Sequence, residues 1–243
     1  MKTIQDPEML ETYLTKCSLP SLFSDFGRYR NHLSLVLFEK GEHIYAQKSD
    51  ISYLYFFVEG KLKVCSNMSN GKSHLLHFYT AFELLGDLEL FNRSNPYVTI
   101  QTVSDSLCIS LALRDTRSFL LQDPVFLRYL CETVCAKLYI SSSNDALSLF
   151  CPLENRLASY INVAGEYRVS GGRRRLVLDE NLTDLAELLE TSYRHLQRTL
   201  KTFTQEGILR RSKQRCYEVI DLPRLQALAT DAYLVPAPPV VES

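Results

Sequence analysis

The segment at residues 182–209, LTDLAELLETSYRHLQRTLKTFTQEGIL, reads as two short helices joined by a tight turn. On a helical wheel of about 100° per residue, the second helix separates into two opposite edges. One edge is apolar and contains Leu196, Leu200 and Phe203. The other edge is cationic and contains Arg194, Arg198 and Lys201. Solvated helices usually mix acidic residues into the polar face, so this division indicates a helix that faces an anion.

Residues around these helices are suited to ending and joining them. Ser192 stands directly before the second helix, where its hydroxyl can accept a hydrogen bond from the first turn. Thr183 is the expected cap of the first helix, and Asp184 and Glu187 suit its positive end. The two helices and their tight turn predict a helix-turn-helix, and the basic, strand-like stretch after Gly207 predicts a β-hairpin wing.

A winged helix-turn-helix with clustered cations is typical of DNA-binding proteins. The major groove admits one α-helix, and arginine can hydrogen-bond guanine bidentately. We therefore expect DNA contacts from Ser192, Tyr193, Arg194, Arg198, Lys201, Arg211 and Lys213. The alternative is a structural helical unit with a solvated charged surface, which the charge alone favours. Spacing, cap and wing together favour DNA binding.

The region from about residue 33 to 113 alternates short β-rich stretches with turns. The stretches are LSLVLF, HIYAQ, YLYFFVEG, KLKVCSN, SHLLHFY, YVTIQTVS and LCISLAL. Asn70-Gly71 is a strong hairpin signal because both residues tolerate positive φ. Many short strands with regular turns predict a β-roll or barrel. We expect residues 1–122 to form this sensor domain, including an N-terminal helical segment, in a protein of the α+β class.

A long helix is expected next. Asp123 can cap it and Pro124 suits its first position, with about 25 helix-compatible residues following. Its apolar residues recur at spacings of three and four, which predicts one face suited to a partner. We expect residues 123–150 to form a dimerisation helix through Leu127, Leu130, Val134 and Leu138. Packing against its own β-domain is the alternative.

The last part of the chain is expected to form the DNA-binding domain, at residues 151–230. It begins near Pro152 and contains a hairpin around Gly171-Gly172 before the helix-turn-helix. The Pro-rich residues 231–243 predict a disordered tail.

These features resemble the cyclic-AMP receptor / fumarate-nitrate regulator (Crp/Fnr) superfamily of bacterial transcription factors. The resemblance spans about residues 33–228 and rests on FEKGEHIYAQKSDISYLYFFVEGKLKV, LLGDLELF and the helix-turn-helix segment. FLRYLC, CPLENRLASYI and SYRHL are most similar to the YeiL-type branch. The resemblance implies a cyclic-nucleotide-binding-like jelly roll, a central dimerisation helix and a winged helix-turn-helix. It also implies a homodimer that reads a palindromic operator in double-stranded DNA and contacts RNA polymerase.

The resemblance also assigns the base-reading positions, which fall on Tyr193, Arg194 and Arg198. Members of the superfamily often carry Arg-Glu where this chain has Tyr193-Arg194, so the operator should differ. Glu190 takes the place of the superfamily's turn glycine. This departure costs little if the backbone avoids positive φ.

The effector segment departs from the pattern of cyclic-nucleotide binders. Those proteins hold the phosphate with a cassette that begins Gly-Glu-Leu and ends in an arginine. The corresponding residues here are Gly86, Asp87, Leu88, Arg93, Tyr97 and Val98, with Pro96-Tyr97-Val98 at the arginine's place. An uncompensated phosphate is costly to bury, so we expect that cyclic AMP binding is lost, unless Arg93 reaches in through a different loop. The effector cannot be read from the sequence.

Other chemistries find little support. The chain has seven cysteines but no C-x-x-C, and only Cys17 lies near the N-terminus, so neither zinc nor an iron–sulfur cluster is expected. Cys131 and Cys135 lie one helical turn apart; they could form disulfides across a dimer, and buried apolar cysteines are the alternative. No nucleophile is paired with a base, so no cofactor, metal, catalytic residue or enzymatic activity is expected.

The composition is that of a globular protein, with 46% hydrophobic and 23% charged residues and a net charge of −1. No run of about 18 apolar residues occurs, and MKTIQDPEML lacks the pattern of a signal peptide. We therefore expect a cytoplasmic protein with no membrane partner. The competing function is a cyclic-nucleotide or other small-molecule receptor that signals through protein contacts rather than DNA.

Overall fold

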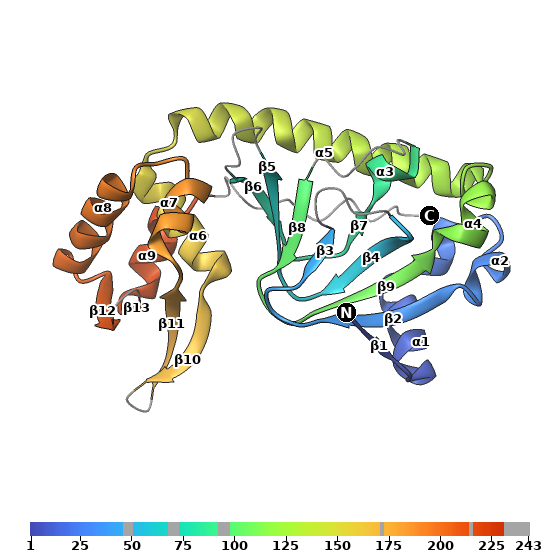
Figure 1. The fold of residues 1–243 in the computed structure, drawn as a ribbon, viewed down its shortest axis with the longest axis horizontal. Coiled ribbons are helices and arrows are strands. Elements are labelled where there is room, and N and C mark those ends of the chain that lie inside the picture. Colours follow the sequence, from blue (N-terminus) through green and yellow to red (C-terminus); the bar gives the residue numbers. More distant parts are fainter. Residues whose placement is uncertain (46–50, 68–72, 92–97, 171–172, 214–215, 231–243) are drawn as a thin grey trace. The chain divides into compact units, whose positions relative to one another are not determined.

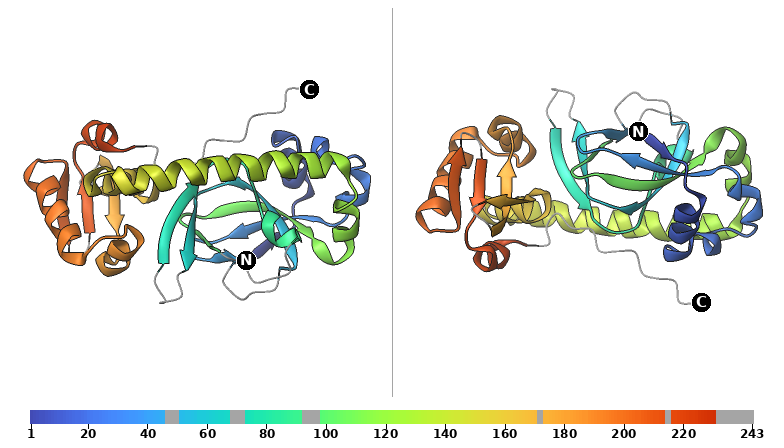
Figure 2. Two further views of the ribbon diagram at one scale, coloured as in Figure 1. Left: turned by 90° about the horizontal axis from the view of Figure 1, so that it is seen from above. Right: turned by 90° about the horizontal axis from the view of Figure 1, so that it is seen from below.

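The computed structural model describes residues 1–45, 51–67, 73–91, 98–170, 173–213 and 216–230 of the chain. The described residues fall into two compact units. One contains residues 1–64 and 79–141, and the other contains residues 65–78 and 142–230. Figures 1 and 2 show the helices and strands of both.

The first unit contains most of a β-roll and the helices around it (Figure 1). The strands of the roll, of which β5 and β6 extend into the second unit, are β1 (Lys2–Ile4), β2 (Leu33–Phe38), β3 (His43–Tyr45), β4 (Tyr53–Glu59), β5 (Leu62–Asn67), β6 (Ser73–Tyr79), β7 (Glu83–Leu85), β8 (Val98–Thr102) and β9 (Ser106–Ala112). The helices are α1 (Pro7–Lys16), the 3-10 helix η1 (Leu19–Leu22), α2 (Gly27–Arg30), α3 (Asp87–Phe91), α4 (Leu113–Leu120) and the first part of α5 (Pro124–Phe150).

The strands of the roll form two sheets, ordered β1-β2-β9-β4-β7 and β3-β8-β5-β6. Every strand pair of the first sheet is antiparallel. Its inner face contributes fully buried side chains such as Leu54, Phe56 and Ile109 to the core. The predicted β-roll is therefore confirmed. The additional strands β1 and β7 were not expected, because a strand of only three residues is too short to show alternation.

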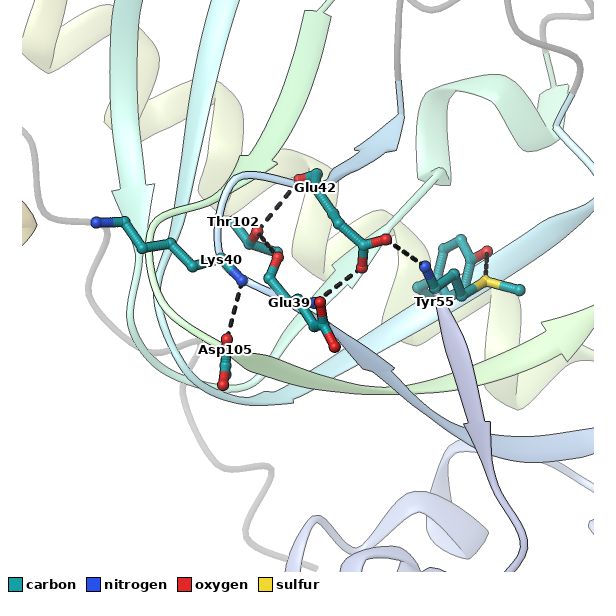
Figure 3. Close-up of polar contacts among 7 residues, drawn as sticks. Glu39, Lys40, Glu42, Tyr55, Thr102 and Asp105 are labelled. Carbon is teal, nitrogen blue, oxygen red and sulfur yellow. Dashed lines mark hydrogen bonds and ion pairs between the residues drawn. The ribbon is translucent and has the colours of Figure 1, made fainter. Parts of the chain in front are cut away.

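The turn between β2 and β3 is held by polar contacts (Figure 3). The backbone N–H of Glu39 donates a hydrogen bond to Oε2 of Glu42, 2.8 Å away. The Thr102 hydroxyl donates to the carbonyl oxygen of Glu39, 2.6 Å away. Gly41 adopts a φ of 87°, which glycine reaches without strain. These contacts explain why Lys-Gly-Glu forms a tight turn here.

Helix α5 begins where the sequence predicts. Oδ1 of Asp123 accepts hydrogen bonds from the backbone N–H groups of Val125 and Phe126, at 3.0 and 3.1 Å. The buried side chains of Phe126 and Leu130 belong to the core of the first unit. Helix α5 therefore packs against its own β-roll, the arrangement that was the alternative to a partner-facing stripe.

The residues of the predicted dimerisation stripe do not share one exposed face in the single chain. Leu130 is buried in the β-roll core, and Leu127 and Val134 pack against the same core. Only Leu138 is exposed, with 66% of its surface accessible. Apolar periodicity identifies a helix face that is covered, but it does not identify the neighbour that covers it. The outward face of α5 instead carries Val125, Cys131, Cys135, Leu138 and Tyr139, all exposed in the single chain.

The second unit contains a four-stranded antiparallel sheet and the predicted helix-turn-helix. The sheet is ordered β10-β11-β13-β12. The elements are α6 (Leu153–Ala164), β10 (Glu166–Ser170), β11 (Arg173–Asp179), α7 (Leu182–Leu188), α8 (Tyr193–Gln205), β12 (Leu209–Lys213), β13 (Cys216–Val219) and α9 (Leu222–Leu228). The hairpin β12–β13 directly follows α8 and is the predicted wing (Figure 1).

Some expectations concern parts of the chain outside the described residues. These are the Asn70-Gly71 turn, Arg93, Tyr97, the Gly171-Gly172 turn and the tail at residues 231–243. Among the described helices, none combines the length and the apolar character needed to cross a membrane.

Candidate nucleic-acid interface

Helix α8 starts at the cap that the sequence predicts. Oγ of Ser192 accepts a hydrogen bond from the backbone N–H of His195, 3.1 Å away. The first N–H groups of a helix have no partner within the helix, so those of Tyr193 and Arg194 point outward at the positive end of the helix dipole. This end of α8 is therefore suited to an anionic oxygen.

The cap of α7 differs from the prediction. Oδ1 of Asn181, and not the hydroxyl of Thr183, caps the helix, because it accepts a hydrogen bond from the Thr183 backbone N–H at 3.1 Å. Both residue types cap helices well, and they stand two positions apart. The sequence therefore could not decide which of them is the cap.

The turn between α7 and α8 also differs from the expectation. Glu190 adopts a φ of 48°, in the left-handed region, so the condition under which a glutamate would cost little at this position is not met. This conformation closes α7, since the backbone N–H of Thr191 reaches the Ala186 carbonyl oxygen at 2.9 Å. The turn thus keeps the geometry of a glycine turn with a glutamate in it, and it carries strain.

The apolar edge of α8 is buried as predicted. Leu196 and Leu200 have no exposed surface, and Phe203 is 1% exposed. Through this edge α8 packs against α6, α7 and β12. The orientation of α8 on its domain is therefore fixed by hydrophobic burial, and its opposite edge must face outward.

The cationic edge is free. Arg194, Arg198 and Lys201 are exposed, and no carboxylate among the described residues pairs with any of them. Tyr193 is 46% exposed, and its hydroxyl accepts a hydrogen bond from Nε2 of Gln197 at 2.9 Å. These four outward side chains share one surface, and Gln197 restricts the position of the tyrosine ring.

A concave surface lies between α8 and the wing, and we call it the α8 groove. Its lining residues are Ser192, Arg194, His195, Gln197, Arg198, Leu200, Lys201, Thr204, Arg211 and Tyr217. The lining contains four permanent cations and no carboxylate. It brings together five of the seven residues that the sequence predicts to contact DNA.

The wing divides its arginines between two roles. Nη2 of Arg210 lies 2.6 Å from Oε2 of Glu218, whose side chain is 8% exposed, and Arg175 approaches the same oxygen at 4.0 Å. Arg211 is exposed and lines the α8 groove. Lys213 ends strand β12, and its side chain lies outside the described residues. The sequence did not reveal the buried Glu218, because a lone acid in a strand carries no burial signal.

Within the described residues of the predicted effector segment, Gly86 and Asp87 lie close to other side chains of the first unit. Gly86 has a φ of 91°, and a Cβ there would lie 2.5 Å from the Tyr45 hydroxyl. Asp87 is buried and pairs with Lys137 of α5, with Oδ2 and Nζ 2.9 Å apart. Leu88 is 49% exposed, and Val98, half-buried, begins β8. Sequence reasoning placed Asp87 here but missed Lys137.

Comparison with known proteins agrees with this architecture. Residues 35–123 match the cyclic nucleotide-binding domain family, and residues 155–228 match the Crp-like helix-turn-helix domain family. The chain belongs to the Crp/Fnr superfamily of transcription regulators. Like its relatives in that superfamily, it is a transcription regulator and not an enzyme.

Among Crp/Fnr relatives, the regulatory protein YeiL of Escherichia coli O157:H7 is 29% identical over 190 residues, covering 78% of this chain and 83% of YeiL. The CRP-like cAMP-activated global transcriptional regulator of Mycobacterium tuberculosis is 22% identical over 180 residues, covering 73% and 80%. The predicted membership of the superfamily is thus confirmed.

Solved Crp/Fnr structures share the fold. A protein from Eubacterium rectale assigned to the Crp/Fnr family superposes with a TM-score of 0.67 at 16% identity, covering 83% of this chain and 92% of that one. A Crp-family regulator from Thermus thermophilus gives a TM-score of 0.59 at 17% identity, covering 79% and 95%. The predicted α+β fold of β-roll, long helix and winged helix-turn-helix is confirmed.

Proposed function

We propose that this Crp/Fnr regulator binds a palindromic operator as a homodimer in the cytoplasm, and that it does so without cyclic AMP. The observation that carries the proposal is the free cationic edge of α8, formed by Arg194, Arg198 and Lys201. A surface without neutralising carboxylates attracts a polyanion over its whole length.

The α8 groove supports a division of roles on DNA. Arg194 and Arg198 lie in the first half of α8, the part of a recognition helix that reaches base edges in the major groove. The uncapped N–H groups beside Ser192 suit a phosphate oxygen. Lys201 and the wing residues Arg211 and Lys213 are assigned to the phosphate backbone, which positions the helix but carries no base specificity.

The outward face of α5 supports self-association. Leu138 and Tyr139 are 66% and 76% exposed, a costly arrangement for adjacent large side chains on the face of α5 that points away from the β-roll. A two-fold pair of chains would place the two copies of α8 on half-sites about 34–36 Å apart, one turn of DNA. Such a pair would read a palindrome.

Two features support the loss of cyclic AMP binding. Oδ2 of Asp87 is paired with Lys137, and Asp87 is only 7% exposed, which limits the access of a ligand hydroxyl to this carboxylate. In the sequence, Pro96-Tyr97-Val98 stands where a phosphate-binding arginine would be needed. Contact with RNA polymerase remains a prediction from the resemblance to the superfamily.

The proposal is tested by selecting duplexes from a random DNA library with the full-length protein and no added nucleotide. We expect enrichment of a palindrome, and a loss of its binding in the Arg194→Ala/Arg198→Ala variant. A matched control, Lys16→Ala/Arg114→Ala, removes the same charge from exposed positions of the first unit and should still bind. No enrichment, or unchanged affinity of the α8 variant, would favour the receptor that signals through protein contacts.

Calorimetry separates the cyclic AMP part of the proposal from the DNA part. We expect no binding heat when cyclic AMP is titrated into the full-length protein, and no change in affinity for the selected operator. Saturable binding that strengthens operator affinity would overturn this part while leaving DNA recognition intact.

A further inference from the structure

A buried group of charges joins α5 to the β-roll. Nζ of Lys137 lies 2.9 Å from Oδ2 of Asp87 and 3.3 Å from Oε1 of Glu83, and it donates a hydrogen bond to the Leu84 carbonyl oxygen at 2.6 Å. Glu83 begins β7 and Asp87 begins α3. One ammonium group therefore ties α5 to two neighbouring elements of the roll. We call Lys137, Asp87 and Glu83 the α5 ion cluster.

The cluster is shielded from water. Glu83 is 3% and Asp87 7% exposed, and 20% of the Lys137 side chain is accessible. Burial by itself lowers the pKa of Lys137, but Tyr79, Asp87 and Glu83 outweigh this effect and raise it above the ordinary value. Burial raises the pKa of Glu83, which Lys137 partly offsets. Lys137 is therefore a permanent cation at this position.

No other described group can replace Lys137. Within the described residues it is the only cation paired with either carboxylate. Removing it leaves two buried carboxylates without a counter-ion, and such a loss is more costly than the loss of an exposed pair. The ion pairs between α5 and the roll at β7 and α3 thus depend on one lysine, in addition to the apolar contacts of Phe126 and Leu130.

The cluster also helps to fix the rotation of α5, together with the buried Phe126 and Leu130. Successive residues on a helix point about 100° apart, so fixing Lys137 inward fixes Leu138 outward. Leu138, Cys135 and Cys131 follow at helical spacing on the exposed face. The ion pair at Asp87 therefore contributes to which side chains α5 presents to a second chain.

Two hydroxyl groups on the inward side of α5 cannot take over the role of the Lys137 ammonium group. Tyr129 and Thr133 lie two turns and one turn before Lys137, and neither hydroxyl makes a well-formed hydrogen bond. Neither group carries a charge that could neutralise Asp87 or Glu83. The electrostatic tie is therefore the property of Lys137 and not of a polar helix face in general.

The geometry points to Lys137 as an internal substitute for an effector: its ammonium holds α5 in one rotation on the β-roll, so that operator binding needs no small molecule. This inference rests on the proposed function, because its final readout is DNA affinity. It assigns to one side chain the role of positioning the outward face of α5.

The inference is tested with the full-length Lys137→Met and Lys137→Arg variants. Hydrogen exchange should become about a hundredfold faster in α5 of Lys137→Met, the effect expected for a broken buried pair. The same variant should lose affinity for the selected operator, and Lys137→Arg should restore both properties. Unchanged exchange and unchanged affinity in Lys137→Met would overturn the inference.

A control separates a positioning role from simple destabilisation. Val36→Ala removes buried volume from β2, a strand outside the cluster, where Val36 is 1% exposed. We expect it to lower the melting temperature without changing operator affinity below that temperature. If Val36→Ala lowers operator affinity as much as Lys137→Met does, Lys137 has only a structural role and the inference fails.

A second variant covers the case in which Lys137→Met does not fold. Lys137→Met/Glu83→Gln/Asp87→Asn removes all three charges and leaves no unpaired ion. It should fold and bind the operator more weakly than the wild type; equal affinity would overturn the inference. The exchange measurement needs no DNA, so a protein that selects no operator defeats the proposed function without affecting the result on the ion cluster.

Discussion

The Arg210 guanidinium lies 2.6 Å from the Glu218 carboxylate, between Nη2 and Oε2, at paired positions of β12 and β13. Arg211, the next residue, faces the other side of the strand and lines the α8 groove. Adjacent arginines in one basic stretch therefore have different tasks: one stabilises the wing, and the other is available to an anion.

These different roles predict that alanine substitutions of the two arginines change different quantities. Arg211→Ala should leave stability unchanged and reduce the slope of log affinity against log salt by about 0.9, the value for one phosphate. Arg210→Ala should lower the free energy of unfolding by about 1–2 kcal/mol, because Glu218 is buried while Arg210 is half exposed. Salt titrations and urea denaturation check the two effects. Equal salt slopes in both variants would contradict the division of roles.

Arg194 and Lys201 should differ in the kind of DNA affinity that they provide. Arg194→Ala should cost about 1–3 kcal/mol at one base pair of each half-site and relax the preference there. Lys201→Ala should weaken binding to all sequences alike, because a phosphate contact carries no base information. Repeating the duplex selection with each variant shows whether a position loses its preference.

Ser192 should contribute stability through its cap. Ser192→Ala removes the acceptor for the His195 backbone N–H and should lower the free energy of unfolding by about 1 kcal/mol. Ser192→Asp keeps an acceptor and serves as the matched control. Urea denaturation measures both, and equal losses in the two variants would show that the cap has no role.

Glu190 should be a site where substitution stabilises the protein. Its φ of 48° strains any residue with a Cβ, so Glu190→Gly should raise the free energy of unfolding by about 1 kcal/mol. Glu190→Ala keeps the Cβ and should bring no such gain. Both variants lose the carboxylate, and only Glu190→Gly relieves the backbone strain. The difference between their melting temperatures therefore reports the strain alone.

Asp123 should make the stability of the first unit depend on acid. Burial by itself raises its pKa, but hydrogen bonds from Ser24, Phe126 and Tyr29 outweigh this and hold the pKa below the ordinary value. A lowered native pKa gives stability that is present above the unfolded value of about 3.9 and is lost as the pH falls through the native pKa. The free energy of unfolding of Asp123→Asn should therefore fall less than that of the wild type between pH 6 and 3. Urea denaturation at each pH measures this fall, relative to the free energy of unfolding of the same protein at neutral pH.

The sequence predicted the elements whose signals are local. The cap at Ser192 and the buried edge at Leu196 and Leu200 follow from residue type and helical period, and both were found. The β-roll followed from repeated short strands and turns. Such features depend on neighbours along the chain, which a single sequence displays.

The features that sequence reasoning missed depend on contacts between distant residues. Leu130 belongs to a periodic stripe, yet the period does not say that the β-roll covers it. Lys137 is one more polar residue on a helix, and its burial appears only when β7 and α3 are placed beside it. Glu190 shows a further limit, because a residue type that disfavours positive φ still adopts it where the turn requires it.

The exposed pair Leu138 and Tyr139 has a consequence for how cellular abundance becomes a signal. If the free chain is monomeric and the operator takes a pair, occupancy at low abundance grows with the square of the chain concentration. The rates of synthesis and degradation of the regulator would then control operator occupancy directly. A change in expression would be amplified at the operator without any change in metabolite level.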